Sequence, residues 1–178
     1  ELLRMSIDRI REKMDIRPAK NGKVLAFISC KGGSGATFIA SNLAHALSTI
    51  ENTKVGFLDL NLQFGDASLF VSEHKPTSTL ADLTHDIRRL DASLLTGSMM
   101  QISPSFSLLA APEDPAQGLE VAPDHIEKII ALARSQFDFV VIDVGRSLDA
   151  ATLKALDHAD MLFPVLQLTL PYVRDGKR

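Results

Sequence analysis

The stretch Ser29–Phe38, SCKGGSGATF, decides how the rest of this chain is interpreted. It lies between an apolar run, VLAFIS at 24–29, and a segment with helical periodicity at 37–47. A glycine-rich turn in this position directs successive backbone N–H groups and the positive end of a helix dipole at one spot. The stretch therefore predicts a phosphate-binding loop between a buried strand and a helix.

The loop lacks the lysine that such loops usually carry. In the pattern GxxxxGK[ST], the lysine reaches the β and γ phosphates and the hydroxyl binds Mg²⁺. Here Cys30 and Gly35 stand at the two glycine positions, Ala36 at the lysine position and Thr37 at the hydroxyl position. A lysine stands earlier in the loop instead, at Lys31.

Outward from the loop, apolar runs alternate with stretches of helical periodicity. We expect strands at 24–29, 55–60, 108–111, 139–143 and 161–168, and helices at 37–47, 80–87, 92–100, 124–135 and 149–158. Strands that are apolar throughout are typical of a parallel sheet covered on both faces. The order of elements predicts an α/β domain with a doubly wound, mainly parallel sheet and helices on both faces.

Composition restricts the class of protein. The 178 residues, 46% of them hydrophobic, suit one domain with an apolar core. The net charge of -3 argues against a surface devoted to nucleic acid, because phosphate binding needs clustered cations. Cys30 is the one cysteine and permits no internal disulfide. No stretch approaches the roughly 20 apolar residues of a membrane-spanning helix, so we expect a cytoplasmic protein.

The first 22 residues are expected to stand apart from this domain. Apolar residues recur there at the spacing of one helical face, and residues 1–23 hold seven basic residues against four acidic ones. We interpret residues 1–22 as a helix that links to an upstream domain; contact with a membrane surface or nucleic acid stays open. The nucleotide-binding domain is assigned to 23–178, and we expect it to continue past Arg178 because a new helix begins after Pro171.

The KGGSGAT loop resembles the deviant Walker A loop of the ParA/MinD family of ATPases. The sequence LDLNLQFGDASLFV at 58–71 resembles the second motif of that family, and FDFVVIDV at 137–144 resembles its Walker B strand. With ADLTHDIRRLD, LLAAPEDP and LQLTLPYVRDGKR, the chain is most similar to the tight-adherence pilus assembly branch, the CpaE/TadZ type. The resemblance covers nearly all of 23–178 and implies a P-loop NTPase fold and an upstream receiver-like domain.

The resemblance also implies individual site residues for ATP and Mg²⁺. The nucleotide set is Lys31, Gly32, Gly33, Ser34, Gly35, Ala36, Thr37 and Phe38. The metal set is Thr37, Asp59 and Asp143, with Asp143 acting through water. The catalytic set is Lys31, which would reach the phosphates of a second copy in a dimer, together with Asp59 and Asn61. The alternatives are an exposed loop lysine, helix-capping or turn aspartates, and a turn asparagine.

Three departures from the family bear on hydrolysis more than on the fold. Ala36 removes the cation of the loop. Asn61 stands where relatives usually have an aspartate, two residues after Asp59, and Gly145 with Arg146 replaces a Pro-containing switch after the Walker B aspartate. Backbone amides carry much of the binding of ground-state phosphate, so we expect ATP binding to be retained and hydrolysis to be slow or absent.

The leading functional hypothesis is a dimerising assembly or localisation factor for a pilus or secretion machine. Its expected partners are a second copy across the nucleotide and pilus or secretion assembly proteins; DNA is disfavoured. The membrane, or a cell pole, would be reached only through partners. One alternative is an active partition or cell-division ATPase acting on DNA or membrane, which Asn61 and the acidic pI disfavour. Another is a degenerate scaffold that binds no nucleotide.

Overall fold

The computed structural model describes residues 21–168. The predicted N-terminal helix and the helix predicted after Pro171 lie outside the described residues. The strands are β1 Lys23–Ser29, β2 Val55–Asp59, β3 Met100–Ser103, β4 Phe106–Leu109, β5 Phe139–Asp143 and β6 Met161–Val165. The helices are α2 Ala36–Ser48, α3 Ala67–Val71, α4 Leu80–His85, η1 Ile87–Arg89, α5 Ala92–Ser98, α6 Pro115–Gly118, α7 Pro123–Gln136 and α8 Ala150–Asp157.

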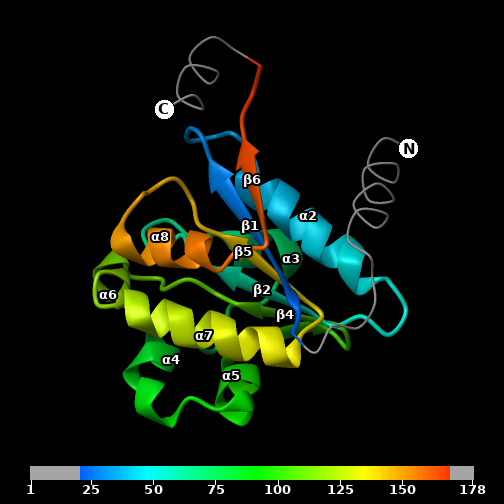
Figure 1. Ribbon diagram of the computed structural model, residues 1–178, viewed down its shortest axis with the longest axis vertical. Helices are drawn as coiled ribbons and strands as arrows, with labels where there is room; N and C mark the ends of the chain where they lie inside the picture. Colours follow the sequence, from blue (N-terminus) through cyan, green and yellow to red (C-terminus); the bar gives the residue numbers. More distant parts are fainter. Residues whose placement is uncertain (1–20, 169–178) are drawn as a thin grey trace.

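The six strands form one sheet in the order β3-β4-β2-β5-β1-β6. Every neighbouring pair is parallel except β3 with β4, which is antiparallel at one edge. In Figure 1, α2 and α3 lie on one side of the sheet and α7 and α8 lie on the other. The predicted doubly wound, mainly parallel sheet is confirmed.

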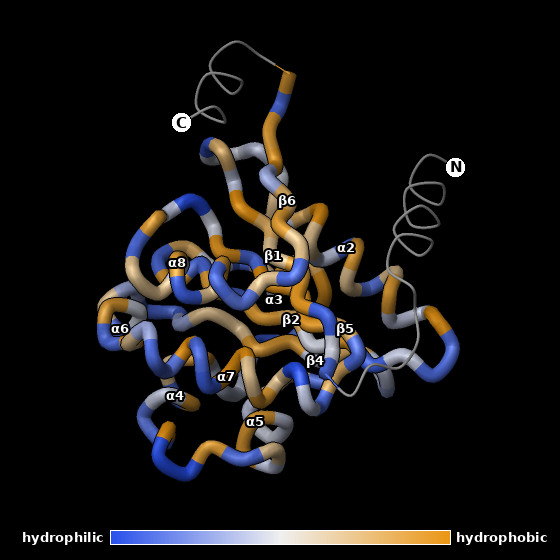
Figure 2. The backbone as a smooth tube through the Cα atoms, in the orientation of Figure 1, coloured by the Kyte–Doolittle hydropathy of each residue, from blue (hydrophilic) through white to orange (hydrophobic). Residues whose placement is uncertain are grey.

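The core lies in two layers, one on each face of the sheet. In β1, Leu25 and Phe27 pack in the layer that contains the buried face of α2, whereas Val24 and Ala26 pack in the layer that contains α7. Alternate residues of a strand point to opposite faces, so a strand buried on both sides has to be apolar throughout. Figure 2 shows hydrophobic residues concentrated along the central strands.

Several predicted element boundaries differ from the structure. The strand predicted at 108–111 is β4, at 106–109, the strand predicted at 161–168 ends at Val165, and the helix predicted at 80–87 ends at His85. The helix predicted at 92–100 ends at Ser98, and Met100 instead begins β3. Met99 has extended backbone, and Met100 pairs with Leu108 of β4 in a hairpin, so strand pairing overrides the helical spacing at this end. The structure also adds the short helices α3 and α6, which are too short to show a periodicity in the sequence.

The topology brings three strand ends to one place. The chain runs from β1 past the position of β5 to β2, and later returns to fill that gap with β5. The carboxyl ends of β1, β2 and β5 therefore lie side by side, and Asp59 is directly paired in register with Asp143. In open α/β sheets a ligand site forms at such a point. None of the helices formed by residues 21–168 has the length and hydropathy needed to cross a membrane.

Candidate functional site

The loop between β1 and α2 has the backbone of an anion cradle. Gly33 and Gly35 have φ of 78° and 89°, in the left-handed region that favours glycine. Gly35 is the N-cap of α2, and no side chain caps the helix there. A Cβ added to Gly35 would have no neighbouring atom within 4 Å, so the space at the start of the helix is open. The first N–H groups of α2 can therefore donate to an external acceptor.

The same loop is fastened to the end of β6. The Cys30 N–H donates to the Val165 carbonyl at 3.0 Å, and the Gln167 side-chain amide donates to the Gly33 carbonyl at 3.1 Å. Ser34, which is buried, donates through its hydroxyl to Ser29 at 3.0 Å. Cys30 itself is half-buried.

Thr37 and Asp143 join the start of α2 to the end of β5. The Thr37 hydroxyl donates to Oδ2 of Asp143, and Oδ1 of Asp143 accepts from the Gly145 N–H at 3.2 Å. Burial raises the pKa of Asp143, while these two hydrogen bonds act in the opposite direction. A hydroxyl beside a carboxylate is an oxygen donor set that suits Mg²⁺, whose other ligands would be water and phosphate.

Asp59 lies at the end of β2 and is 1% exposed. Burial, and then the neighbouring Asp143, raise its pKa from 3.8 to about 7. Its Oδ1 accepts from the Asn61 N–H at 3.1 Å and its Oδ2 from the Ala67 N–H at 3.0 Å. Both carboxylate oxygens therefore organise the loop between β2 and α3.

The side chain of Asn61 is hydrogen-bonded within the turn that contains it. Its Nδ2 donates to the Phe64 carbonyl at 2.9 Å. Its Oδ1 lies against Gly145, where an added Cβ would approach it to 2.7 Å, and Gly145 has φ of 66°. The loop after β2 and the loop after β5 are thus in close contact, which only a glycine at 145 permits.

These elements enclose an open cleft of about 510 Å³. Seven of the predicted site residues line it: Gly32, Gly33, Gly35, Ala36, Thr37, Phe38 and Asn61. Lys31 is exposed on the loop, and the buried Ser34, Asp59 and Asp143 lie behind the lining. The structure therefore brings the loop together with the start of α2 and Asn61, and it connects Asp143 to the cleft through Thr37.

Sequence reasoning did not assign six other lining residues to the site. They are Ser29, Phe64, Asp66, Phe70, Gly145 and Arg146. Gly145 and Arg146 were visible as departures from the family pattern, and that signal could have placed them in the site. Phe64 and Phe70 offered no such signal, because their exposure at the rim of the cleft depends on how the segment around α3 folds.

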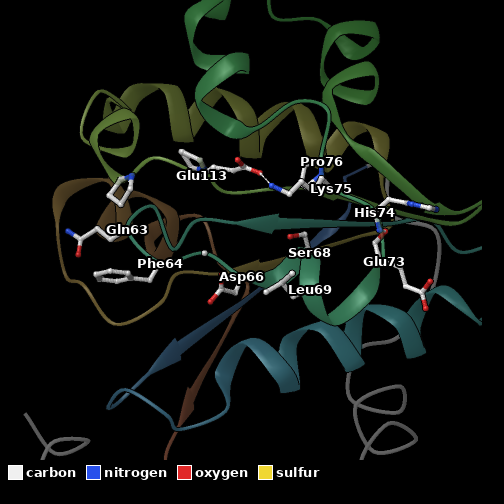
Figure 3. Close-up of a pocket in the computed structure, with 14 residues that line it drawn as sticks. Gln63, Phe64, Asp66, Ser68, Leu69, Glu73, His74, Lys75, Pro76 and Glu113 are labelled. Carbon is white, nitrogen blue, oxygen red and sulfur yellow. Dashed lines mark hydrogen bonds and ion pairs between the residues drawn. The ribbon is translucent and has the colours of Figure 1, made fainter.

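A second cleft of about 460 Å³ borders the first and shares Phe64 and Asp66 with it. Figure 3 shows these two residues on the side opposite Glu113 and Lys75, which form an ion pair of 3.6 Å. Both partners of that pair are largely exposed, so the pair contributes little stability. The second cleft has neither the glycine-rich backbone nor the buried carboxylates of the first.

The described residues fit a nucleotide with Mg²⁺, apart from one missing charge. The open space at Gly35 and the uncapped helix suit phosphate oxygens, and Thr37 with Asp143 suits the metal. Ala36 is 2% exposed and supplies no cation.

Comparisons with known proteins agree with this geometry. A family model described as an AAA domain matches residues 22–176. A ParA family ATPase from Chlorobium tepidum TLS superposes with a TM-score of 0.83 at 34% identity, covering 89% of this chain and 65% of that one. The septum site-determining protein MinD from Pyrococcus horikoshii OT3, solved with Mg-ADP, gives a TM-score of 0.73 at 21% identity, covering 86% and 61%.

A sequence relative gives the same result. The septum site-determining protein MinD of Bacillus subtilis (strain 168) is 23% identical over 163 residues, which are 88% of this chain and 58% of that protein. The chain thus spans little more than half the length of this curated relative. The family model covers most of the chain and the fold agrees with it. The chain therefore belongs to the AAA domain family, and its fold is that of the ParA- and MinD-like P-loop NTPases.

Proposed function

We propose that this chain binds ATP with Mg²⁺ and that the bound nucleotide brings two copies together. In this proposal the dimer acts as an assembly or localisation factor for a pilus or secretion machine, with slow or absent hydrolysis. The observation that carries the proposal is the open, uncapped start of α2 beside the Thr37–Asp143 hydrogen bond. It combines a phosphate cradle with oxygen ligands for a divalent cation.

In this proposal, different residues bind the phosphates and the metal ion. Backbone N–H groups from Gly32 to Phe38 hold the phosphates, and Thr37 with Asp143 holds Mg²⁺, Asp143 through water. Asp59 keeps the neighbouring loop in place. Two structural neighbours support a nucleotide here: the Pyrococcus horikoshii MinD complexed with Mg-ADP, and cobyrinic acid a,c-diamide synthase from Mycobacterium smegmatis with a bound ATP analogue and magnesium.

Slow hydrolysis follows from two side chains. Ala36 offers no charge to stabilise the transition state, and removing one preorganised stabiliser typically costs about a hundredfold to a thousandfold in turnover. Asn61 is neutral, and its amide N–H already donates to the Phe64 carbonyl, so it cannot serve as a general base.

Dimerisation across the nucleotide is supported by the rim of the cleft. Phe38, Phe64 and Phe70 are 57%, 71% and 51% exposed, and the rings of Phe38 and Phe70 lie 6.2 Å apart in an edge-on arrangement. A group of exposed aromatic side chains around a cleft is typical of an interaction site. Lys31 is exposed on the same loop, where a second copy could receive it. A second copy would cover the rim and close the nucleotide site.

The test separates binding, turnover and assembly. On the full-length protein we expect micromolar or tighter binding of Mg·ATP, turnover well below that of an ordinary P-loop ATPase, and a doubling of mass with Mg·ATP. Lys31→Ala should abolish the mass change, whereas Lys54→Ala, at the opposite end of β2, should not. Ordinary turnover, or a Lys31→Ala protein that still dimerises, would contradict this assignment.

The similarity to ParA and MinD proteins is equally consistent with an active partition or cell-division ATPase acting on DNA or membrane. That function requires ATP-dependent binding to DNA or to lipid vesicles, together with turnover that these ligands stimulate. A scaffold that binds no nucleotide is the other alternative, and it would show no rise in melting temperature with Mg·ATP.

The pilus or secretion role is supported by the resemblance to the CpaE/TadZ branch rather than by the site. The same resemblance implies a linker helix at 1–22, between an upstream receiver-like domain and a nucleotide-binding domain at 23–178. The proposed role also implies a cytoplasmic location, and partners would bring the protein to a cell pole or to the inner membrane face. Fluorescent tagging in cells with and without the pilus genes tests this role.

A further inference from the structure

We propose that Arg146 supplies a positive charge for binding the phosphates of the ground state, in place of the loop cation that Ala36 removes. The proposal rests on the proposed function, because it assigns the cation of the same nucleotide site. Arg146 would reach the phosphates from the wall formed by the loop after β5, whereas a lysine at position 36 would reach them from α2.

The position of the guanidinium is the first observation. Arg146 follows the end of β5 and lines the same cleft as the phosphate loop, Ala36 and Thr37. Its Nη1 lies 3.7 Å from the point that a Cβ on Gly32 would occupy. The side chain therefore spans the cleft from the β5 side to the loop.

The backbone before Arg146 is held against β1. The Val144 N–H donates to the Phe27 carbonyl at 3.0 Å, and the Gly145 carbonyl accepts from the Ser29 N–H at 2.7 Å. Gly145 then turns the chain through a left-handed conformation, with φ of 66°. These constraints fix where residue 146 leaves the sheet, so the side chain starts from a defined point beside the phosphate loop.

The electrostatic state of Arg146 is the second observation. Within the part of the chain that the structure describes, its guanidinium has neither a hydrogen bond nor an ion pair, and a guanidinium carries a positive charge. Its planar donors match phosphate oxygens. The loop lacks a cation at position 36, and a cation without an anionic partner faces the loop from the opposite wall.

The experiment is a charge series at one position. Mg·ATP and Mg·ADP are titrated calorimetrically into the full-length wild type, Arg146→Lys and Arg146→Ala. Arg89→Ala is the matched control, because Arg89 is exposed on η1, between α4 and α5 and away from the phosphate loop in Figure 1. We expect Arg146→Ala to weaken Mg·ATP by about tenfold to a hundredfold, which is the usual size of a charge-assisted hydrogen bond. Arg146→Lys keeps the charge but loses the planar donors, so it should weaken Mg·ATP binding less than Arg146→Ala does.

A second readout separates binding from folding. Without nucleotide, all four proteins should melt at the same temperature, because residue 146 is exposed. Arg146→Ala should also lose part of the salt dependence of ATP binding.

Each remaining outcome has a definite meaning. Affinity within twofold of wild type in Arg146→Ala, an equal loss in Arg89→Ala, or a loss in Arg146→Lys as large as in Arg146→Ala would overturn the role of Arg146 and leave the proposed function standing. A wild type that binds neither nucleotide would overturn both.

Discussion

At the scale of single residues, Asp59 is a carboxylate whose burial favours the protonated form. Its pKa is raised from 3.8 to about 7 by burial and by Asp143. Between these values the folded chain binds more protons than the unfolded chain, so this group lowers the free energy of unfolding as pH rises from about 4 to 7. The stabilisation is present in acid and is lost as pH rises through the folded pKa. The raised pKa of Asp143 acts in the same direction.

We expect this effect to appear in urea unfolding without Mg²⁺ as the difference between the wild type and Asp59→Asn. The wild type should lose about 2 to 4 kcal/mol relative to the variant between pH 5 and pH 8, since one pKa unit corresponds to about 1.4 kcal/mol. Residue 59 of the variant cannot ionise, so the contributions of the other titrating groups to the free energy of unfolding cancel in the comparison. Parallel profiles for the two proteins would show that the pKa of Asp59 is not raised.

Thr37 permits a test of the metal assignment. Thr37→Val removes the hydroxyl that donates to Asp143 and keeps the shape of the side chain. We expect Mg·ATP binding to weaken about tenfold, while ATP binding in EDTA changes little, because the hydroxyl acts through the metal. Thr37→Ser retains the hydroxyl and should keep the preference for Mg²⁺. Equal losses with and without Mg²⁺ would count against a metal ligand at this position.

How much of the site could be predicted depends on how far apart its parts lie in the sequence. The glycine loop and Thr37 are contiguous, so a local pattern contained them. Asp143 was predicted from the resemblance of 137–144 to a Walker B strand, and it does end β5, which runs from Phe139 to Asp143. Arg146 faces the loop only after β5 has paired with β1, and no spacing in the sequence shows that pairing. The turn in which the Asn61 side chain is held is likewise a product of tertiary contacts.

At the scale of elements, the ends of a strand or helix could be predicted from the sequence where burial determines them. β5 is completely buried and is apolar up to Asp143, and α7 has a proline at its start, so both could be located closely. β3 could not be located, because its half-exposed residues continue a helical spacing and its pairing with β4 decides its structure. α3 begins where Ala67 donates to Asp59, a contact between residues eight positions apart.

The same substitution at two glycines should act in opposite directions. In β2, an added Cβ on Gly56 would lie 2.7 Å from Cδ2 of Phe137, so Gly56→Ala should cost about 1 to 3 kcal/mol by overpacking. In α5, an added Cβ on Gly97 meets nothing within 4 Å, so Gly97→Ala should stabilise the protein by about 0.5 to 1 kcal/mol. Chemical denaturation measures both values. Phe137→Leu should reduce the penalty at Gly56, and an unchanged penalty would mean that the ring is not its cause.

At the scale of the whole molecule, we expect the exposed aromatic side chains at the cleft, Phe38, Phe64 and Phe70, to determine assembly. We expect Phe64→Ser to weaken the Mg·ATP-dependent dimer at least tenfold, because it removes an exposed aromatic anchor. Leu119→Ser is the control, since Leu119 is 80% exposed, follows α6 and does not line the cleft. Sedimentation measures the dimer and calorimetry measures ATP affinity. Loss of dimer in both variants would indicate a general effect of surface hydrophobicity.

The pairing of Asp59 with Asp143 across neighbouring strands has a consequence for the lifetime of the protein. Two buried carboxylates with raised pKa values weaken the fold at neutral pH, and a bound cation would relieve that strain. If Mg·ATP binds as proposed, an empty copy opens more often than a loaded one, and proteases act on the opened form. The site would then influence how long each copy survives as well as what it assembles with.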